Sequence, residues 1–172
     1  GVTGILGSML LKDLLEKSNS TIYCLVRDKN LLNAEKRILS IFEVYKTEER
    51  IYEKFKKRVK LIHSDITKEK LGLTPKAYDE LADSIDLTIH NAAKVSLHGI
   101  YENLIKTNVS GTESMIDFAL KTKQQYLVHV STYAVMGDRQ YESSQPFTEK
   151  DFDIGQGFLH MGYQQSKFIA EK

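Results

Sequence analysis

The chain has 172 residues, 41% of them apolar, which fits one domain with a hydrophobic core. A formal net charge of +1 gives no reason to expect nucleic acid or an acidic membrane surface as the main partner, and the basic run over 50–60 is interleaved with glutamates like a solvated helix face. The single cysteine, Cys24, excludes an internal disulfide. The sequence shows no apolar stretch of membrane-spanning length and no recognisable signal peptide, so we expect a cytoplasmic protein.

Helical and extended patterns alternate along the chain. Apolar residues at helical spacing predict a helix over 5–15, and a β-branched and aromatic run predicts a buried strand over 21–26. The later expected elements are a long helical stretch over 31–57 that divides near Thr47, a strand over 59–63, an irregular segment over 68–81 with a short helix after Pro75, a strand over 87–90, a helix over 100–122, a strand over 126–131, a long loop over 136–162, and a helix from about Tyr163.

This alternation predicts right-handed βαβ units and a doubly wound parallel sheet, the Rossmann fold of the α/β class. The chain opens directly on Gly1, without the apolar strand that should precede such a glycine run, and stops within an expected helix at Lys172. We therefore expect one Rossmann domain over 1–172 that is truncated at both ends. Ligands of such sheets bind beyond the carboxyl ends of the strands, which gives each motif below a position to satisfy.

Glycines at a spacing of three and three open the chain. At a strand-to-helix turn, the first permits a tight bend, the second lets the backbone approach a pyrophosphate, and the third allows close packing of the helix. The helix amino terminus would face the phosphates with unpaired N–H groups and a partial positive charge. The expected cofactor contacts in this segment are Gly1, Thr3, Gly4, Ile5, Leu6 and Gly7.

The residue after the strand over 21–26 decides between the two nicotinamide dinucleotides. An acidic side chain there would bind a free ribose 2′-hydroxyl, whereas arginine would pair with a 2′-phosphate. Arg27 follows the strand and Arg37 lies ten residues further on, so two guanidinium groups could clamp the phosphate. Asp28 leaves the alternative of a 2′-hydroxyl open. On balance the pattern favours NADP(H).

Two further strand ends carry candidate cofactor contacts. The segment after the strand over 59–63 would lie near the adenine, and small residues after the strand over 87–90 let the backbone pass close to the cofactor. The expected contacts are Asp65, Ile66, Asn91, Ala92 and Ala93, although Asn91 could equally be a turn residue. His90 is interpreted as a packing residue, and no metal site is expected because the histidines, His98 among them, lack metal-ligand spacing.

The pattern Tyr-x-x-x-Lys occurs twice, and position separates the two pairs. Tyr52 with Lys56 lies in the charged helical stretch, remote from the carboxyl end of any strand. Tyr163 with Lys167 opens the helix that follows the strand over 126–131 and its long loop, and Thr132 stands at the end of that strand. We therefore expect the second pair to carry the chemistry and to contact the cofactor.

Reduction of a carbonyl explains the combination of these side chains. Hydride delivered to carbon builds negative charge on oxygen, which must be hydrogen-bonded and then protonated, but a free tyrosine has a pKa of ~10. We expect Lys167, one helical turn away, to lower the pKa of Tyr163, and Thr132 to hold the substrate oxygen. Lys167 could also bind the nicotinamide ribose. Asn108 is a candidate for ordering a water relay to the lysine, or equally a helical polar residue that binds backbone.

Together these motifs resemble an extended short-chain dehydrogenase/reductase over the whole chain. More narrowly, the chain is similar to the thioester reductase domains that end non-ribosomal peptide synthetases, carboxylic acid reductases and aminoadipate reductases. The segments that carry this similarity are 23–27 with 34–37, 89–95 and 162–172. The resemblance implies that two arginines hold the NADP 2′-phosphate and that Thr132, Tyr163 and Lys167 form a catalytic triad.

The resemblance also implies a reaction: an acyl or peptidyl thioester on the phosphopantetheine arm of a carrier protein is released as an aldehyde, and a second round would give an alcohol. Two residues depart from the family pattern, Ser64 where glycine is usual and Phe168 where tryptophan is common. Substrate choice in such enzymes lies largely beyond residue 172. Fatty acyl-CoA reductase, nucleotide-sugar epimerase or dehydratase, and a non-catalytic NADP-binding domain remain the alternatives, the last disfavoured by the presence of Tyr163 and Lys167.

Overall fold

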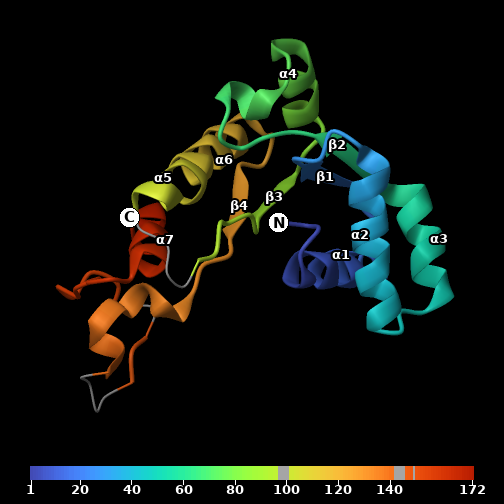
Figure 1. Cartoon of the computed structure of the whole chain (residues 1–172). Coiled ribbons are helices and arrows are strands. Elements are labelled where there is room, and N and C mark those ends of the chain that lie inside the picture. Colours follow the sequence, from blue (N-terminus) through green and yellow to red (C-terminus); the bar gives the residue numbers. More distant parts are fainter. Residues whose placement is uncertain (97–100, 142–145, 149) are drawn as a thin grey trace. The chain divides into compact units, whose positions relative to one another are not determined.

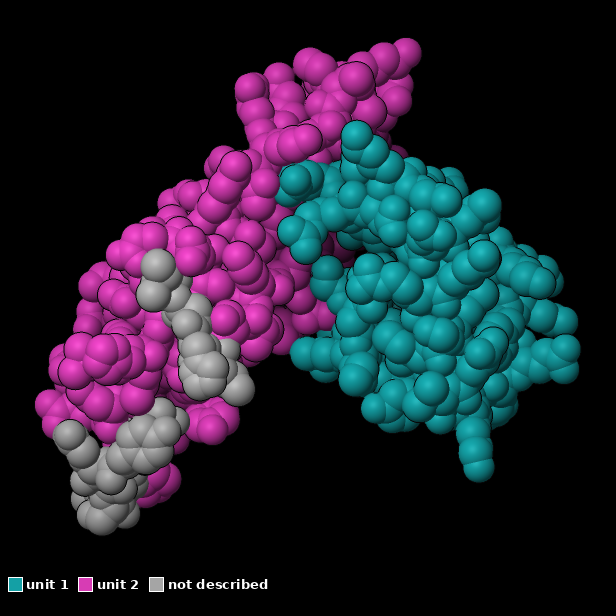
Figure 2. Space-filling view, in the orientation of Figure 1, with its two compact units in different colours: residues 1–65 teal, residues 66–172 magenta. Residues whose placement is uncertain are grey.

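The structure is a computed structural model that describes residues 1–96, 101–141, 146–148 and 150–172 (Figure 1). The chain folds into two compact units, Gly1–Asp65 and Ile66–Lys172 (Figure 2). Residues 97–100, which include His98 and the expected start of one helix, lie outside the described residues. None of the helices in the described part is long and apolar enough to cross a membrane.

The first unit contains a two-stranded parallel sheet and three helices. Its elements are α1 (Ile5–Lys17), β1 (Ile22–Val26), α2 (Leu31–Val44), α3 (Glu49–Arg58) and β2 (Val59–His63). The register of the strands pairs Ile22 with Val59 and Val26 with His63. The expected strands over 21–26 and 59–63 and the expected helix over 5–15 are therefore present, the helix extending by two residues.

The long helical stretch divides where the sequence predicted, near Thr47. Lys46 adopts a left-handed conformation with φ 48°. Its N–H donates to the carbonyl oxygen of Glu43 at 3.0 Å, and the N–H of Thr47 donates to that of Phe42 at 2.9 Å. These two bonds form a Schellman motif, which satisfies the last carbonyls of α2 and turns the chain toward α3.

Apolar side chains from all three helices and from β1 form the core of this unit. Phe42 meets Phe55 edge-on, with ring centroids 6.2 Å apart. The buried members of the core are Leu11, Leu15, Cys24, Ile38, Phe42, Ile51 and Phe55. The apolar spacing that predicted the first helix, Leu6, Leu10 and Leu14, does not mark the face that α1 buries, because Leu6 is exposed while Leu11 and Leu15 are buried.

Two cationic side chains of the basic run bind backbone carbonyl oxygens outside α3. The Lys54 ammonium donates to the carbonyl oxygen of Leu15 at 3.0 Å. The Arg58 guanidinium donates to the same oxygen at 3.0 Å and to the carbonyl oxygen of Ser20 at 2.9 Å. Since the last carbonyls of a helix lack intrahelical partners, these side chains cap α1, and the expectation of a purely solvated face was wrong for them.

The second unit holds the other parallel pair. Its elements are η1 (Glu69–Gly72), α4 (Pro75–Asp83), β3 (Leu87–His90), α5 (Glu102–Asn108), α6 (Ser110–Lys121), β4 (Tyr126–His129), η2 (Tyr133–Tyr141) and α7 (Gly162–Glu171). Strands β3 and β4 pair in register from Leu87 with Tyr126 to His90 with His129. Helix α7 contacts both α5 and η2 (Figure 1).

Three expectations for this unit need correction. The helix expected over 100–122 is two helices, because the Thr112 hydroxyl donates to the carbonyl oxygen of Asn108 at 2.7 Å and the backbone turns at Val109. The strand expected to reach Ser131 ends at His129, although the N–H of Val130 still donates to His90. Residue 136, the expected start of the long loop, lies inside η2, which continues to Tyr141. This helix is kinked at Gly137 (φ 57°).

Candidate active site

The candidate residues fall into two groups, one in each unit. In the first unit, Gly4 is the N-cap of α1 and its N–H donates to the carbonyl oxygen of Gly1 at 3.1 Å, which closes the turn. A Cβ on Gly7 would lie 2.2 Å from that same oxygen, whereas a Cβ on Gly4 would lie 3.4 Å from it. Only the third glycine is thus required by the packing of α1 against the turn. No acidic side chain occupies the first turn of α1, so its N–H groups and dipole meet no anion from that turn.

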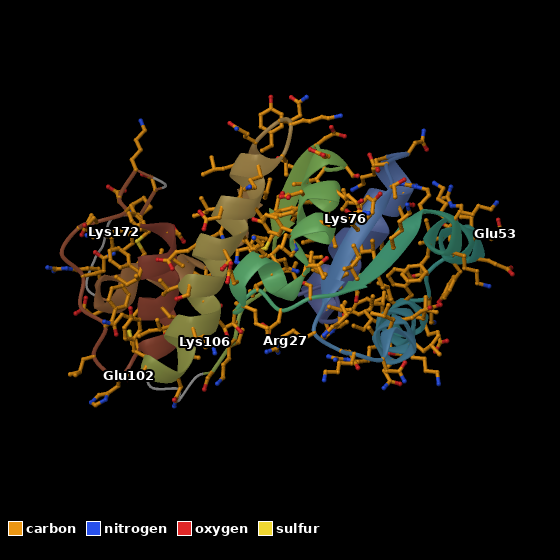
Figure 3. The ribbon with its side chains drawn as sticks, turned by 90° about the horizontal axis from the view of Figure 1, so that it is seen from above. Arg27, Glu53, Lys76, Glu102, Lys106 and Lys172 are labelled. Carbon is orange, nitrogen blue, oxygen red and sulfur yellow. The ribbon has the colours of Figure 1, made fainter. Side chains whose placement is uncertain are left out.

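Both arginines expected at the 2′-phosphate lie in the first unit. Arg27 comes directly after β1 and is exposed (labelled in Figure 3), and Arg37 is exposed on α2. An Asp28 oxygen, by contrast, accepts from the N–H of Asn30 at 2.9 Å and so supports the turn that leads into α2.

Gly111 on α6 faces the Ile66 side chain. A Cβ on Gly111 would lie 2.8 Å from Cδ1 of Ile66, so a larger residue there would require the Ile66 side chain to shift. The Ile66 side chain, an expected cofactor contact, is buried and packs against α6 in this way. Asp65 ends the first unit, one residue after the N–H of Ser64 extends the β1–β2 ladder by donating to Val26 at 2.8 Å.

Asn108 holds the segment that follows β3. Its side-chain oxygen accepts from the N–H of Lys94 at 2.7 Å, and its amide donates to the carbonyl oxygen of Lys94 at 3.0 Å. The same amide donates to the Ser166 hydroxyl at 2.8 Å, and Ser166 in turn donates to the carbonyl oxygen of Tyr163 at 2.7 Å. The structure therefore shows Asn108 binding backbone, the second of the two interpretations of the sequence. This clamp fixes the loop that carries Asn91, Ala92 and Ala93 relative to α7.

Thr132 and Ser131 lie just beyond β4. The Thr132 hydroxyl oxygen accepts from the N–H of Ala134 at 3.3 Å, which leaves its own proton without a partner among the described residues. The hydroxyl of Ser131 is buried and likewise has no partner there. Because a hydroxyl that accepts a backbone bond still has a proton to donate, Thr132 can bind a substrate oxygen.

Tyr163 is half-buried at the start of α7, and burial raises the pKa of its phenol. This direction is opposite to the lowering expected from Lys167. In the described part of the chain, the phenol makes no hydrogen bond with that lysine, whose ammonium turns to β4 instead. The lowering remains a proposal about the working enzyme.

Lys167 is 1% exposed, and its ammonium binds the end of β4. Its Nζ lies 2.9 Å from the carbonyl oxygen of Val130 and 2.9 Å from Nε2 of His129. Burial lowers the pKa of Lys167, with Glu171 opposing the shift. A lysine almost free of solvent, held by two neutral acceptors at the carboxyl end of a strand, is uncommon in a packing role, because burying a cation is costly.

Aromatic rings attach the loop before α7 to the helix beside this lysine. Phe168 stacks on Phe152 with centroids 4.8 Å apart and lies 5.1 Å from Phe158. The loop is also tied to η2 by the N–H of Gly157, which donates to Asp138 at 2.8 Å. Phe168, which departs from the family pattern, thus keeps an aromatic packing role.

Sequence reasoning missed two residues of this site, His129 and Ser166. His129 was one of several scattered histidines, and only the strand register places it beside Lys167. A signal was nevertheless present, since residue 129 lies two positions before Ser131, at the expected carboxyl end of its strand. Of the described residues, no three histidine, cysteine or acidic side chains are grouped to hold a metal.

Comparisons with known proteins bear on this site. A family of NAD-binding domains described as male sterility protein matches residues 1–172. The chain is 34% identical over 171 residues to a component of the linear gramicidin synthase of Brevibacillus parabrevis, covering 99% of this chain and 3% of that protein. It is 32% identical over 185 residues to the large subunit of the L-2-aminoadipate reductase of Eremothecium gossypii, covering 99% and 13% respectively.

Solved structures show the same relationship. The terminal R domain from the myxalamid PKS-NRPS biosynthetic pathway superposes with a TM-score of 0.80 at 32% identity, over 99% of this chain and 42% of that one. The reductase domain of a nonribosomal peptide synthetase from Mycobacterium tuberculosis superposes with a TM-score of 0.72 at 25% identity, over the same shares. The chain thus spans less than half of these solved domains and a small part of the curated relatives.

These matches confirm the predicted Rossmann fold class, which the two parallel strand pairs and their helices display. They also confirm the resemblance found in the sequence and agree with a nicotinamide cofactor. The chain belongs to the male sterility protein family of NAD-binding domains, as an extended short-chain dehydrogenase/reductase of the thioester reductase type.

Proposed function

We propose that this chain serves an NADPH-dependent reductase that releases an acyl or peptidyl thioester from a carrier protein as an aldehyde, with further reduction to the alcohol in a second round. The observation that carries the proposal is the buried Lys167 ammonium at the carboxyl end of β4, one helical turn from Tyr163. Within the thioester reductase type, such a lysine fits carbonyl reduction rather than packing.

Each side chain has a part in the proposed reaction. NADPH, when bound, supplies the hydride that reduces the thioester carbonyl carbon. Thr132 donates its free hydroxyl proton to the carbonyl oxygen, and Tyr163 protonates that oxygen as its negative charge grows. The product is a thiohemiacetal, whose C–S bond then breaks to give an aldehyde and the free thiol of the phosphopantetheine arm. Lys167 stabilises the phenolate that Tyr163 leaves behind and binds the ribose hydroxyls of the cofactor.

The choice of NADPH over NADH rests on the first unit. Arg27 directly follows β1 and Arg37 lies on α2, both side chains are exposed, and a guanidinium pairs strongly with a phosphate dianion. Asp28, the alternative ligand for a free 2′-hydroxyl, already holds the backbone of Asn30 with one oxygen. These contacts support the NADP preference that the sequence favoured.

The proposed partner is a thioester on the phosphopantetheine arm of a carrier protein in the same polypeptide. The support comes from relatives named as parts of peptide synthetases. Fatty acyl-CoA reductase remains the nearest alternative, because it needs the same chemistry at the carbonyl. A nucleotide-sugar epimerase or dehydratase is disfavoured by the two arginines.

The test is a substrate comparison on the intact protein. NADPH oxidation is followed with one acyl group presented on a phosphopantetheinylated carrier protein, as coenzyme A thioester, and, in parallel, with a nucleotide sugar. We expect oxidation with the carrier-bound thioester at a kcat/KM above that for the coenzyme A ester, with an aldehyde as product. Preference for the coenzyme A ester would indicate the fatty acyl-CoA alternative, and turnover of the sugar alone would exclude the proposal.

A further inference from the structure

The partners of the Lys167 ammonium are both neutral. Val130 offers its backbone carbonyl oxygen and His129 its imidazole Nε2, each at 2.9 Å from Nζ. Among the residues that the structure describes, Lys167 forms no ion pair with a carboxylate within 4.0 Å, and Glu171 acts on it only at longer range. No described carboxylate therefore cancels the charge of the ammonium, which lies in a setting where charge is poorly screened.

The hydrogen bond with Lys167 fixes the tautomer of His129. Because the ammonium can only donate, Nε2 must accept, and the proton of the neutral ring stands on Nδ1. Nδ1 is buried and has no partner in the described part of the chain. Burial first, and then the Lys167 charge, lower the pKa of His129 to about 4, so the ring is neutral at pH 7.

The ring that faces His129 is also neutral. His90, the register partner of His129, lies with its ring centroid 5.0 Å away. Thr112 donates its only hydroxyl proton to the carbonyl oxygen of Asn108, so Nε2 of His90 must donate to the Thr112 oxygen at 3.0 Å. Burial is the largest cause that lowers the pKa of His90 to about 3, and electrostatic interactions with His129 and Lys167 add to it. Lys167 is thus the cation of this cluster of three.

We infer that His129 is a positioning residue for Lys167: its neutral imidazole fixes the ammonium at the carboxyl end of β4 without cancelling its charge. A carboxylate could hold Nζ as firmly, but it would neutralise the field that Lys167 is proposed to exert on Tyr163. With Val130, His129 supplies two consecutive anchors from one strand end, so β4 as well as α7 sets where the charge lies. This inference rests on the proposed function of Lys167.

Three substitutions at one position test the inference in the intact protein. His129→Leu removes the acceptor, His129→Gln keeps a neutral acceptor, and His129→Glu keeps an acceptor but adds a negative charge. We expect kcat to fall by about 10- to 100-fold in His129→Leu, as for a misplaced catalytic group, with little change in KM for the thioester. His129→Gln should retain kcat within about 3-fold, and His129→Glu should lose as much as His129→Leu.

A double-mutant cycle with Lys167→Met separates this inference from the proposed function. If His129 acts through Lys167, then His129→Leu should cause no further loss of kcat in the Lys167→Met background. A Lys167→Met protein with unchanged turnover would contradict the proposed function itself. Two results would overturn only the role of His129 if Lys167→Met is inactive. One is a fully active His129→Leu protein, and the other is equal activity of His129→Gln and His129→Glu. The last comparison decides even where His129→Leu does not fold.

Discussion

Helices α3 and α7 carry the same Tyr-x-x-x-Lys spacing in different surroundings. On α3, the Tyr52 ring lies edge-on to Phe42 at 5.9 Å, and Lys56 is exposed. On α7, Tyr163 is half-buried, and Lys167 is 1% exposed and bound to the end of β4. The tyrosine of α3 serves the core of its unit, whereas the lysine of α7 is a buried cation. Burial and partners, not spacing, distinguish a reactive pair from a packing one.

The physical reason lies in the screening of charge. An exposed ammonium is solvated, and salt screens its effect on groups farther away than about 10 Å at 0.1 M ionic strength. A buried ammonium acts through a lower effective dielectric, so it can shift the pKa of a neighbour or bind a hydroxyl strongly. The cost of its burial must be offset by hydrogen bonds, which for Lys167 come from Val130 and His129.

The largest expected difference between the two helices is the effect of removing the hydroxyl of each tyrosine. Tyr163→Phe removes the proposed proton donor and should lower kcat by about 10²- to 10⁴-fold, since general acid catalysis contributes that much. Tyr52→Phe removes a hydroxyl from the matched pair and should leave kcat within about twofold. Steady-state NADPH oxidation by the two variants measures both effects. Equal losses in the two, or none in Tyr163→Phe, would show that α7 does not hold the reacting pair.

Gly4 and Gly7 also share one spacing pattern but differ in their surroundings. A Cβ on Gly7 would lie 2.2 Å from the Gly1 oxygen, so Gly7→Ala must displace α1 and should cost about 3 kcal/mol of unfolding free energy. Gly4→Ala meets the same oxygen at 3.4 Å, an ordinary contact, and should cost about 1 kcal/mol or less. Denaturant unfolding of both variants measures the difference. Equal costs would mean that α1 does not depend on this close approach.

Elements whose signals are local could be predicted from the sequence, and elements set by tertiary hydrogen bonds could not. The glycine turn, the first three strands and the division at Thr47 follow from residue types at short spacing, and the structure has them within a residue of where they were expected, whereas the fourth strand ends two residues early. The break at Val109 depends on the Thr112 hydroxyl donating to a helix carbonyl, which apolar periodicity does not reveal.

The same limit applies inside the candidate site. Position alone selected Tyr163 with Lys167 over Tyr52 with Lys56, because strand order places the former beyond β4. The partner of Lys167 was missed, because a single histidine carries no spacing signal and only the register of β3 and β4 gives it a role. Asn108 was left between two interpretations for the same reason, since its partner Lys94 lies in another segment.

A third prediction compares cations of the first unit. Replacing Arg27 and Arg37 with alanine should raise KM for NADPH by about 10- to 100-fold and leave KM for NADH within about twofold. Only the former cofactor carries the 2′-phosphate, and two exposed, partly screened charge pairs with it together contribute about 1.4–2.7 kcal/mol. Replacing the exposed Arg50 and Lys57 of α3 with alanine removes the same charge and should change neither constant. Parallel increases for both cofactors would remove the assignment of the two arginines to the 2′-phosphate.

The smallest expected effect concerns the pH dependence of stability. His90 is 2% exposed and its pKa is lowered, mainly by burial, to about 3, against ~6.5 in the unfolded chain. The unfolded state therefore binds a proton below pH 6.5 that the folded state refuses, so stability falls as the pH falls, by up to about 1.4 kcal/mol per pH unit for this one group. His90→Gln can still donate to Thr112 but does not titrate, so the slope of unfolding free energy between pH 6 and 5 should decrease by about 1 kcal/mol per pH unit. An unchanged slope would mean that His90 is protonated in the folded state at pH 5, and Lys167 would then share its surroundings with a second cation.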